Sequence, residues 1–217
     1  GNIALGFVRL SIIDLSSAGH QPKTTADKRY TIVFNGEIYN YIELREELIK
    51  EGVKFETKTD TEVLLNAYIL WGEKCLERFN GMWAFAIYDN KEKSLFASRD
   101  RYGVKPFYYV KTESQFVFCS EIPPLLPFLG EKVTADHQSI FDYLVFNRTD
   151  QNENTFFKDI KKLQHGTNLT VKDNVVKTQQ WYNLREKVKS TEGFRSADEF
   201  RDCFTDAVRL RLRSDVP

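Results

Sequence analysis

Residues 35–40, Asn-Gly-Glu-Ile-Tyr-Asn, follow an apolar run at 30–34 and place an amide side chain beside the unshielded backbone N–H of a glycine. Two preset donors of this kind suit the oxyanion of a tetrahedral intermediate, because they remove the cost of reorganising water around the developing charge. Gly36 has no Cβ, so its N–H can approach a substrate carbonyl closely. The same letters are also typical of a hairpin turn. Asn35 and Gly36 are therefore candidates for an oxyanion hole, with a turn as the alternative.

Charged side chains of both signs accompany these donors. Arg9 lies in an apolar stretch, Glu37 follows Gly36 directly, and Asp60 precedes a helical pattern. A structural ion pair for Arg9 and a helix cap for Asp60 are the simpler explanations. A free α-amino acid, however, needs a guanidinium for its carboxylate and an acidic group for its ammonium. This chain offers such a set.

The sequence offers no evident nucleophile or metal ligand set. Cys75, Cys119 and Cys203 lie in apolar helical or strand patterns and are interpreted as core thiols. The histidines are dispersed without ligand spacing, so we expect neither a metal site nor a disulfide framework. The glycine-rich phosphate-binding patterns G-x-x-x-x-G-K-[ST] and G-x-G-x-x-G do not occur in the sequence, so no local motif supports ATP or dinucleotide binding. The charged segment 98–106 is interpreted as a hairpin with internal ion pairs.

Composition narrows the function class. The 217 residues are 41% hydrophobic and 14% aromatic, which is typical of a globular, sheet-rich fold. With 31 basic and 31 acidic residues the net charge is zero, so we expect no nucleic-acid partner. No apolar run is long enough to cross a membrane, and the cysteine usage suits a reducing compartment. These features predict a cytoplasmic location without membrane association.

Hydrophobic periodicity predicts the elements that must position these residues. Strands are expected at 3–14, 30–37, 82–88, 94–98, 107–110 and 115–119, with weaker ones at 168–171 and 175–181. The four strands between 82 and 119 are expected to form an antiparallel meander. Helices are expected to begin after caps at Asn40, Asp60, Asp136 and Ser196. The first should bury Ile42, Leu44, Leu48 and Ile49, and the last should bury Phe200, Phe204, Val208 and Leu212. This order of elements predicts an α+β sandwich.

Seven short motifs, in order along the chain, resemble glutamine-hydrolysing asparagine synthase. They lie at 9–14, 19–22, 34–40, 59–62, 80–86, 99–106 and 120–122. The resemblance implies a class II glutamine amidotransferase domain with an N-terminal-nucleophile-type sandwich of antiparallel sheets covered by helices. Two positions depart from the family pattern: Pro123-Pro124 stands in place of a Lys-Ala pair, and residues 162–166 replace a Leu-Pro-Pro-Gly turn.

The resemblance also implies residue roles. Asn35 and Gly36 correspond to the oxyanion hole, Arg9 to the clamp on the glutamine carboxylate, and Glu37 and Asp60 to the partners of its ammonium group. Backbone contacts are implied for Leu10, Ser11, Ile12 and Ile13. The family nucleophile is a cysteine at the mature N-terminus, which is expected upstream of Gly1.

We therefore expect an amidotransferase type 2 domain over 1–183, a linker over 184–195, and over 196–217 the first helix of a C-terminal α/β synthetase domain. Both ends are expected to be truncated, which would leave this piece alone inactive. The implied enzyme is an ATP-dependent carbon-nitrogen ligase that makes asparagine, glutamate, AMP and pyrophosphate from glutamine, aspartate and ATP. ATP and Mg are expected in the synthetase domain and not on the residues present, and a homodimer is left open. The alternatives are amidation of a sugar acid or other carboxylate in surface-polysaccharide synthesis, or a non-catalytic glutamine-binding domain.

Overall fold

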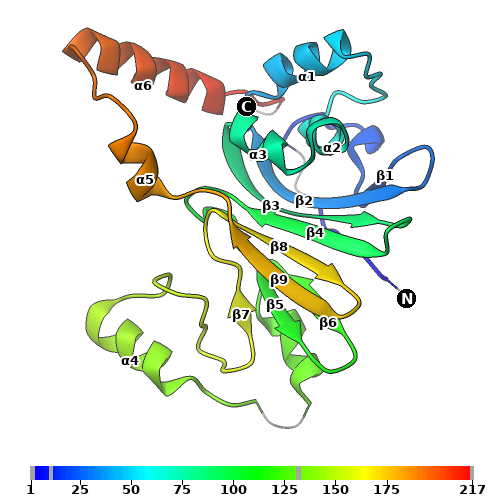
Figure 1. The fold of residues 1–217 in the computed structure, drawn as a ribbon, viewed down its shortest axis with the longest axis vertical. Helices are drawn as coiled ribbons and strands as arrows, with labels where there is room; N and C mark the ends of the chain where they lie inside the picture. The colour runs from blue at the N-terminus through cyan, green and yellow to red at the C-terminus, as the bar shows by residue number, and fades with distance from the viewer. Residues whose placement is uncertain (1–2, 10–11, 131–132, 216–217) are drawn as a thin grey trace. The chain divides into compact units, whose positions relative to one another are not determined.

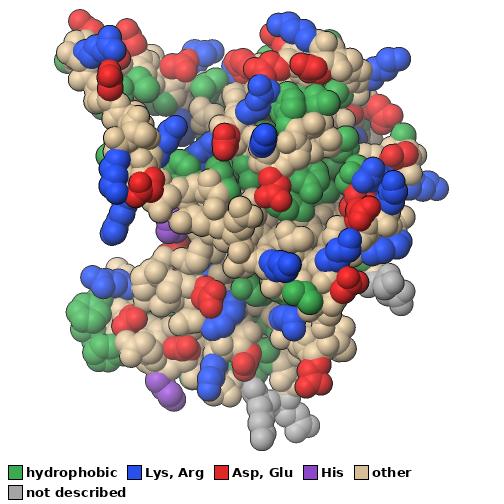
Figure 2. Space-filling model, in the orientation of Figure 1, with side chains coloured by type: hydrophobic (Ala, Val, Ile, Leu, Met, Phe, Trp, Pro, Cys, Tyr) green, Lys and Arg blue, Asp and Glu red, His purple; other side chains and the backbone are tan. Residues whose placement is uncertain are grey.

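The computed structural model describes residues 3–9, 12–130 and 133–215. The chain divides into two compact units (Figure 1). The first unit comprises Gly1–Gly81 with Leu184–Pro217, and the second comprises Met82–Asn183. Figure 2 shows acidic and basic side chains interspersed over the visible face, in keeping with the zero net charge.

Two antiparallel strands and several helices form the first unit. The strands are β1 (Lys23–Thr24) and β2 (Tyr30–Ile38), in a register that places Lys23 opposite Ile32. The helices are η1 (Ser17–Gly19), α1 (Tyr41–Lys50), α2 (Asp60–Trp71), η2 (Gly72–Lys74), α3 (Cys75–Arg78), α5 (Leu184–Lys189) and α6 (Ala197–Arg211). Helix α2 is the most buried of these: its polar first turn is buried, and so are the apolar residues Val63, Leu64, Leu65 and Ala67 that follow.

The caps of the first two helices differ from the prediction. Thr59, not Asp60, caps α2, and its hydroxyl accepts from the Glu62 N–H at 3.2 Å. The Asn40 side chain does not cap α1, because its amide bonds the Arg78 carbonyl and the Asn80 N–H. The buried face of α1 is also narrower than predicted: Leu44 and Leu48 are buried, whereas Ile42 and Ile49 are exposed.

The second unit contains strands of two sheets. One set is antiparallel in the order β3 (Gly81–Asp89), β4 (Ser94–Arg99), β8 (Thr167–Lys172) and β9 (Val175–Gln180). The other sheet has the order β6 (Phe116–Cys119), β5 (Tyr108–Lys111) and β7 (Lys161–Lys162). The helices are η3 (Pro123–Leu129) and α4 (His137–Phe146), the latter capped by Asp136 as predicted. The predicted meander is therefore wrong, because its two hairpins lie in different sheets.

A buried polar pair separates these two hairpins. Asp100 is 1% exposed, and its carboxylate accepts from backbone N–H groups of Trp83, Tyr102, Val104 and Lys105. The Arg99 guanidinium donates to the carbonyls of Gly103, Lys105 and Leu163. The predicted charged hairpin is wrong, because β4 and β5, which flank this segment, lie in different sheets, and the Asp100 and Arg99 side chains bind backbone groups where the chain leaves the first sheet.

Two predictions near the chain ends also differ. Residues 3–9 and 12–14 form no strand, and carbonyls at 13, 14 and 16 accept from the Arg9 side chain instead of a neighbouring strand. Ser196 caps α6 as predicted. The predicted apolar face of α6 is 40% exposed at Val208 and 75% at Leu212, and Phe200 and Phe204 lie between these values. The periodicity thus predicted the helix correctly, but the predicted burial of these four side chains is wrong.

The remaining structural observations bear on the linker and on membranes. The stretch predicted as a linker contains α5, in which no residue is buried. The domain boundaries at 183 and 195 stay predictions. Among the described residues, no helix is both long and apolar enough to cross a bilayer.

Candidate functional site

The predicted oxyanion donors lie near the C-terminal end of β2. Asn35, Gly36 and Glu37 are half-buried, between the buried residues Phe34 and Ile38. The hairpin-turn alternative is wrong, because β2 runs on to Ile38 without a turn. Because side chains alternate along a strand, Asn35 and Glu37 project from the same face.

Asp60 lies directly beside this end of β2. It is the first residue of α2, it is 6% exposed, and its carboxylate accepts from the Ile38 N–H at 3.0 Å. The pKa of Asp60 is raised to about 6, chiefly by burial and also by the nearby Glu37 carboxylate, against the lowering effect of the hydrogen bond from the Ile38 N–H. Two acidic groups close together in a partly dry setting suit a cationic ligand group such as an ammonium.

Arg9 is held by backbone carbonyls. Its guanidinium donates to the carbonyl oxygens of Ser16 at 2.8 Å and Ile13 at 3.1 Å, and also to that of Asp14. It lies against Gly19, where any side chain would overlap the guanidinium. These partners differ from the structural ion pair considered for Arg9.

The predicted backbone contacts can be placed only in part. Leu10 and Ser11 lie outside the described residues. Ile13 is 8% exposed and its carbonyl accepts from Arg9, while the Ile12 carbonyl accepts from the Asp215 N–H.

Gln21 and Asp14 join the three segments that carry the predicted residues. The buried Gln21 amide donates to the Phe34 carbonyl at 3.1 Å, accepts from the Phe34 N–H at 2.6 Å, and lies 3.4 Å from the Thr61 hydroxyl. The Asp14 carboxylate accepts from the Lys58 N–H at 3.1 Å. The segment from Arg9 to Gln21, the end of β2 and the start of α2 are thus linked within one unit.

Sequence reasoning assigned no role to Gln21 or Asp14. Both stand in loops, where local periodicity carries no signal. They do lie within the family-like motifs at 9–14 and 19–22, which were the only hint. The ligand-binding roles of Arg9, Asn35, Gly36, Glu37 and Asp60 stay predictions.

The cysteines lie outside these segments. Cys75 is buried, and burial raises the pKa of its thiol well above the ordinary range. Cys119 is half-buried in β6, and Cys203 is exposed on α6, so the prediction of a core thiol is wrong for Cys203. Within the described ranges, no three His, Cys, Asp or Glu side chains gather to hold a metal ion.

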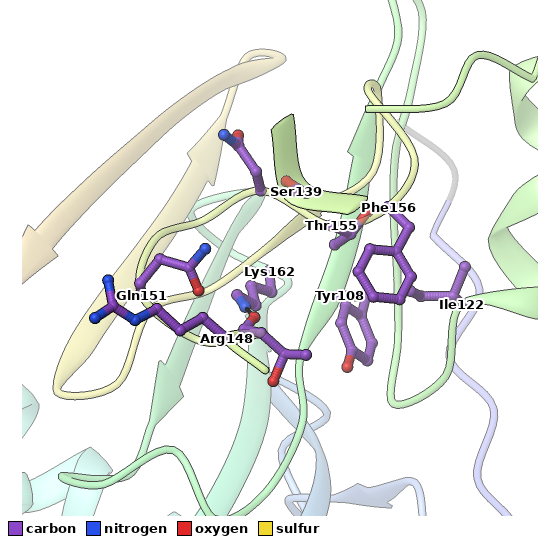
Figure 3. A pocket seen from close by; sticks show the side chains of 10 residues that line it. Tyr108, Ile122, Ser139, Arg148, Gln151, Thr155, Phe156 and Lys162 are labelled. Carbon is purple, nitrogen blue, oxygen red and sulfur yellow. Dashed lines mark hydrogen bonds between the residues drawn. The ribbon is translucent and has the colours of Figure 1, made fainter. Parts of the chain in front are cut away.

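A separate pocket of about 290 Å³ lies in the second unit (Figure 3). It contains none of the predicted site residues. Figure 3 shows Arg148, Gln151 and Lys162 on one side and Tyr108, Ile122 and Phe156 on the other. Lys162 is 5% exposed, but Asp150 accepts from its ammonium at 3.0 Å, so its charge is already paired.

Two relatives that match the whole chain are both named asparagine synthetase. The chain is 38% identical over its whole length to asparagine synthetase [glutamine-hydrolyzing] 3 of Bacillus subtilis (strain 168), and covers 35% of that protein. It is 37% identical over its whole length to a putative asparagine synthetase [glutamine-hydrolyzing] 2 of Methanocaldococcus jannaschii, and covers 45% of it. The chain therefore spans less than half the length of each of these relatives.

Solved structures share the fold. Glutamine phosphoribosylpyrophosphate amidotransferase of B. subtilis matches 75% of this chain and 32% of its own, with a TM-score of 0.52 and 19% identity. A structure described as the allosteric regulatory enzyme of purine biosynthesis matches 81% of this chain and 34% of its own, with a TM-score of 0.55 and 19% identity. The predicted α+β fold of the N-terminal-nucleophile type is confirmed. The glutamine amidotransferase domain family matches residues 1–182, and the chain belongs to that family.

Proposed function

We propose that this chain supplies the glutamine-hydrolysing site of a glutamine-dependent asparagine synthase. Hydrolysis of glutamine would deliver ammonia to ATP-activated aspartate, and the products would be asparagine, glutamate, AMP and pyrophosphate. The observation that carries the proposal is the linkage of the Arg9 loop, the end of β2 and the start of α2 through Gln21, Asp14 and Asp60. The names of the B. subtilis and M. jannaschii relatives, which match this chain over its whole length, support the choice of product.

In this proposal the glutamine backbone is held by its two charges. Arg9 uses some of its five N–H donors on loop carbonyls, and the others bind the α-carboxylate. Residues 10–13 contribute backbone contacts. Glu37 and Asp60 face the α-ammonium, and the ionised form of Asp60 is the binding form.

The side-chain amide of glutamine is then positioned at Asn35 and Gly36. A cysteine thiolate attacks the amide carbon, and the Asn35 amide and the Gly36 N–H donate to the resulting oxyanion. Ammonia leaves as the C–N bond breaks, and water hydrolyses the thioester to glutamate. The nucleophile that the family resemblance implies is an N-terminal cysteine, whose α-amino group serves as base. Cys75, Cys119 and Cys203 are not assigned this role.

ATP activation is assigned to none of the described residues. They include no cluster of metal-binding side chains, and the sequence has no glycine-rich phosphate loop. We propose that ATP, Mg and the acceptor bind in a synthetase domain of the full-length protein.

Glutaminase assays of the full-length protein test the proposal. Asn35→Ala should lower kcat by about 100-fold to 1,000-fold, the usual loss on removing one oxyanion donor. Asn90→Ala is the matched control, because Asn90 lies in the β3–β4 turn and contacts Lys93 there. Equal kcat values for Asn35→Ala and the wild type would remove the oxyanion assignment.

A different acceptor is the nearest rival. The chain is also 32% identical over its whole length to a protein named amidase chry2 of Gibberella zeae, so relatives of this similarity bear different names. Product analysis with aspartate, sugar acids and other carboxylates as acceptors distinguishes the two. Glutamine binding without any ammonia release would instead favour a non-catalytic binding domain.

A further inference from the structure

The residues that follow α6 reach back to the segments of the glutamine site. We call residues 211–215, the last residue of α6 and the four residues after it, the C-terminal strap. They are about 200 positions from the Arg9 loop in sequence, yet both belong to the first unit.

Arg213 anchors the strap on α1. Its guanidinium makes a bidentate pair with the Glu43 carboxylate at 2.6 and 2.5 Å and donates to the Tyr39 carbonyl at 2.7 Å. Its side chain is only 15% exposed, and its hydrogen bonds to the Glu43 carboxylate lower the pKa of that group. The Arg211 guanidinium also lies 4.9 Å from the centre of the Tyr39 ring. Tyr39 directly follows Ile38, whose N–H binds Asp60. The anchor is thus one residue from the ammonium side of the site.

Asp215 binds the Arg9 loop itself. Its N–H donates to the Ile12 carbonyl at 3.0 Å, and its carboxylate accepts from the Asp14 N–H at 2.7 Å. Asp14 makes two further contacts: its backbone carbonyl accepts from the Arg9 guanidinium, and its carboxylate accepts from the Lys58 N–H. A single residue therefore connects Asp215 to the guanidinium.

The backbone of Asp14 shows why the loop needs this support. Its φ is 54°, in the left-handed region that residues other than glycine seldom adopt. Such a conformation persists only where surrounding contacts stabilise it. The contact from Asp215 is among those that hold Asp14 there, together with the Ser16 and Lys58 contacts.

We infer that Arg213 and Asp215 are positioning residues for glutamine binding. The strap holds the loop around Asp14 in the conformation that presents Arg9, and release of the strap lowers the affinity for glutamine without touching the oxyanion donors. By reciprocity, bound glutamine tightens the seating of the strap, so whatever moves the end of α6 regulates glutamine affinity. This inference rests on the proposed function.

The test is a KM-against-kcat comparison for glutaminase activity of the full-length protein. Asp215→Ala and Arg213→Ala should each raise KM for glutamine by about 5-fold to 150-fold, the usual range for coupling between sites, and change kcat by less than about 2-fold. Asp215→Asn keeps an oxygen that can accept from the Asp14 N–H, and it should restore most of the affinity. Arg201→Ala is the matched control, because Arg201 pairs with Asp198 near the start of α6, and its KM should equal that of the wild type.

The outcomes separate the inference from the proposed function. A wild-type enzyme with glutaminase activity and an unchanged KM in both strap variants would overturn the inference alone. Absence of wild-type glutaminase activity would overturn the function. If a strap variant does not fold, Glu43→Ala breaks the same ion pair from the half-exposed α1 side, and it must raise KM as Arg213→Ala would. Equal KM values for Glu43→Ala and the wild type would contradict the role of Arg213.

Discussion

Asp60 occupies a position where its ionised side chain lowers the stability of the folded protein. Its carboxylate is 6% exposed and lies near Glu37, so its ionised form is disfavoured, and its pKa rises from 3.8 to about 6. Between these two pH values the folded chain keeps a proton that the unfolded chain has lost. The contribution of Asp60 to stability therefore falls as pH rises through this window and stays low above it.

We predict that Asp60→Asn stabilises the protein at pH 8 and weakens glutamine binding. A pKa raised from 3.8 to about 6 corresponds to roughly 3 kcal/mol of lost stability, and the neutral amide avoids this cost while it still accepts from the Ile38 N–H. Urea unfolding should show a gain of about 1 to 3 kcal/mol at pH 8 and almost none at pH 4. Glutamine affinity at pH 8 should fall at least about tenfold, since the ammonium loses a charged partner.

Asp27→Asn is the control of opposite sign. Hydrogen bonds from the Thr25 hydroxyl and the Arg29 N–H lower the pKa of this exposed carboxyl, so its contribution is present at pH 8 and is lost as pH falls. The variant should be less stable than the wild type at pH 8 and equal to it in strong acid. A destabilised Asp60→Asn at pH 8 would contradict the role of burial at that site.

Among individual residues, the sequence selects candidates for the chemistry but does not show their contacts. Asn35, Gly36 and Glu37 can be selected because they follow an apolar run, and Asp60 because it precedes a helical pattern; both signals are local. That Asp60 binds the Ile38 N–H, and that Thr59 takes its capping role, depends on how α2 packs beside β2. Gln21 could not be selected, since a polar residue in a loop carries no periodic signal.

Among elements, the helical periods and two of the four predicted caps were correct, whereas the strand partners could not be predicted. Ser196 and Asp136 cap their helices as expected, because a cap involves residues only three positions apart. The pairing of β4 with β8 joins residues about 70 positions apart, and alternation within a strand does not say which strand lies next to it. The meander failed for this reason.

The buried carboxylate of Asp100 leads to a prediction about the stability of the second unit. Asp100→Ala leaves several backbone N–H groups without an acceptor in the interior, each at a cost of about 1 to 3 kcal/mol, so the loss should be at least about 3 kcal/mol. Asp89→Ala removes a carboxylate that accepts from the N–H groups of Lys91 and Glu92 in an exposed turn, where water replaces it. That variant should lose no more than about 1 kcal/mol. Similar midpoints of thermal unfolding for the two variants would show that the buried network is not a major stabiliser.

Helix α6 leads to a second prediction about elements. Phe204 is 59% exposed and Leu210 is 8% exposed, although periodicity alone favours burial of the former. Leu210→Ala should therefore cost about 2 to 3 kcal/mol in urea unfolding of this chain, whereas Phe204→Ala should change stability by less than about 1 kcal/mol. The reverse order would mean that the apolar face of α6 is buried in solution.

For the whole molecule, the division into two units means that bound glutamine should stabilise the first unit and not the second. Every described residue assigned to glutamine binding lies in the first unit, and a ligand stabilises the state that binds it by about 2.7 kcal/mol at 100 times its dissociation constant. Hydrogen exchange of this chain with saturating glutamine should therefore slow at residues 12–21, 34–38 and 58–62, and at the strap residues 213–215 if they are coupled to the site. Amides of the β5–β6 hairpin should exchange at the same rate with and without glutamine, because this hairpin belongs to the second unit, which carries none of the assigned residues. 4-Aminobutanamide, which lacks the α-carboxylate that Arg9 is proposed to bind, is the matched ligand and should give little protection. Equal protection by both ligands would show that Arg9 is not the carboxylate clamp, and protection confined to the second unit would place the binding site elsewhere.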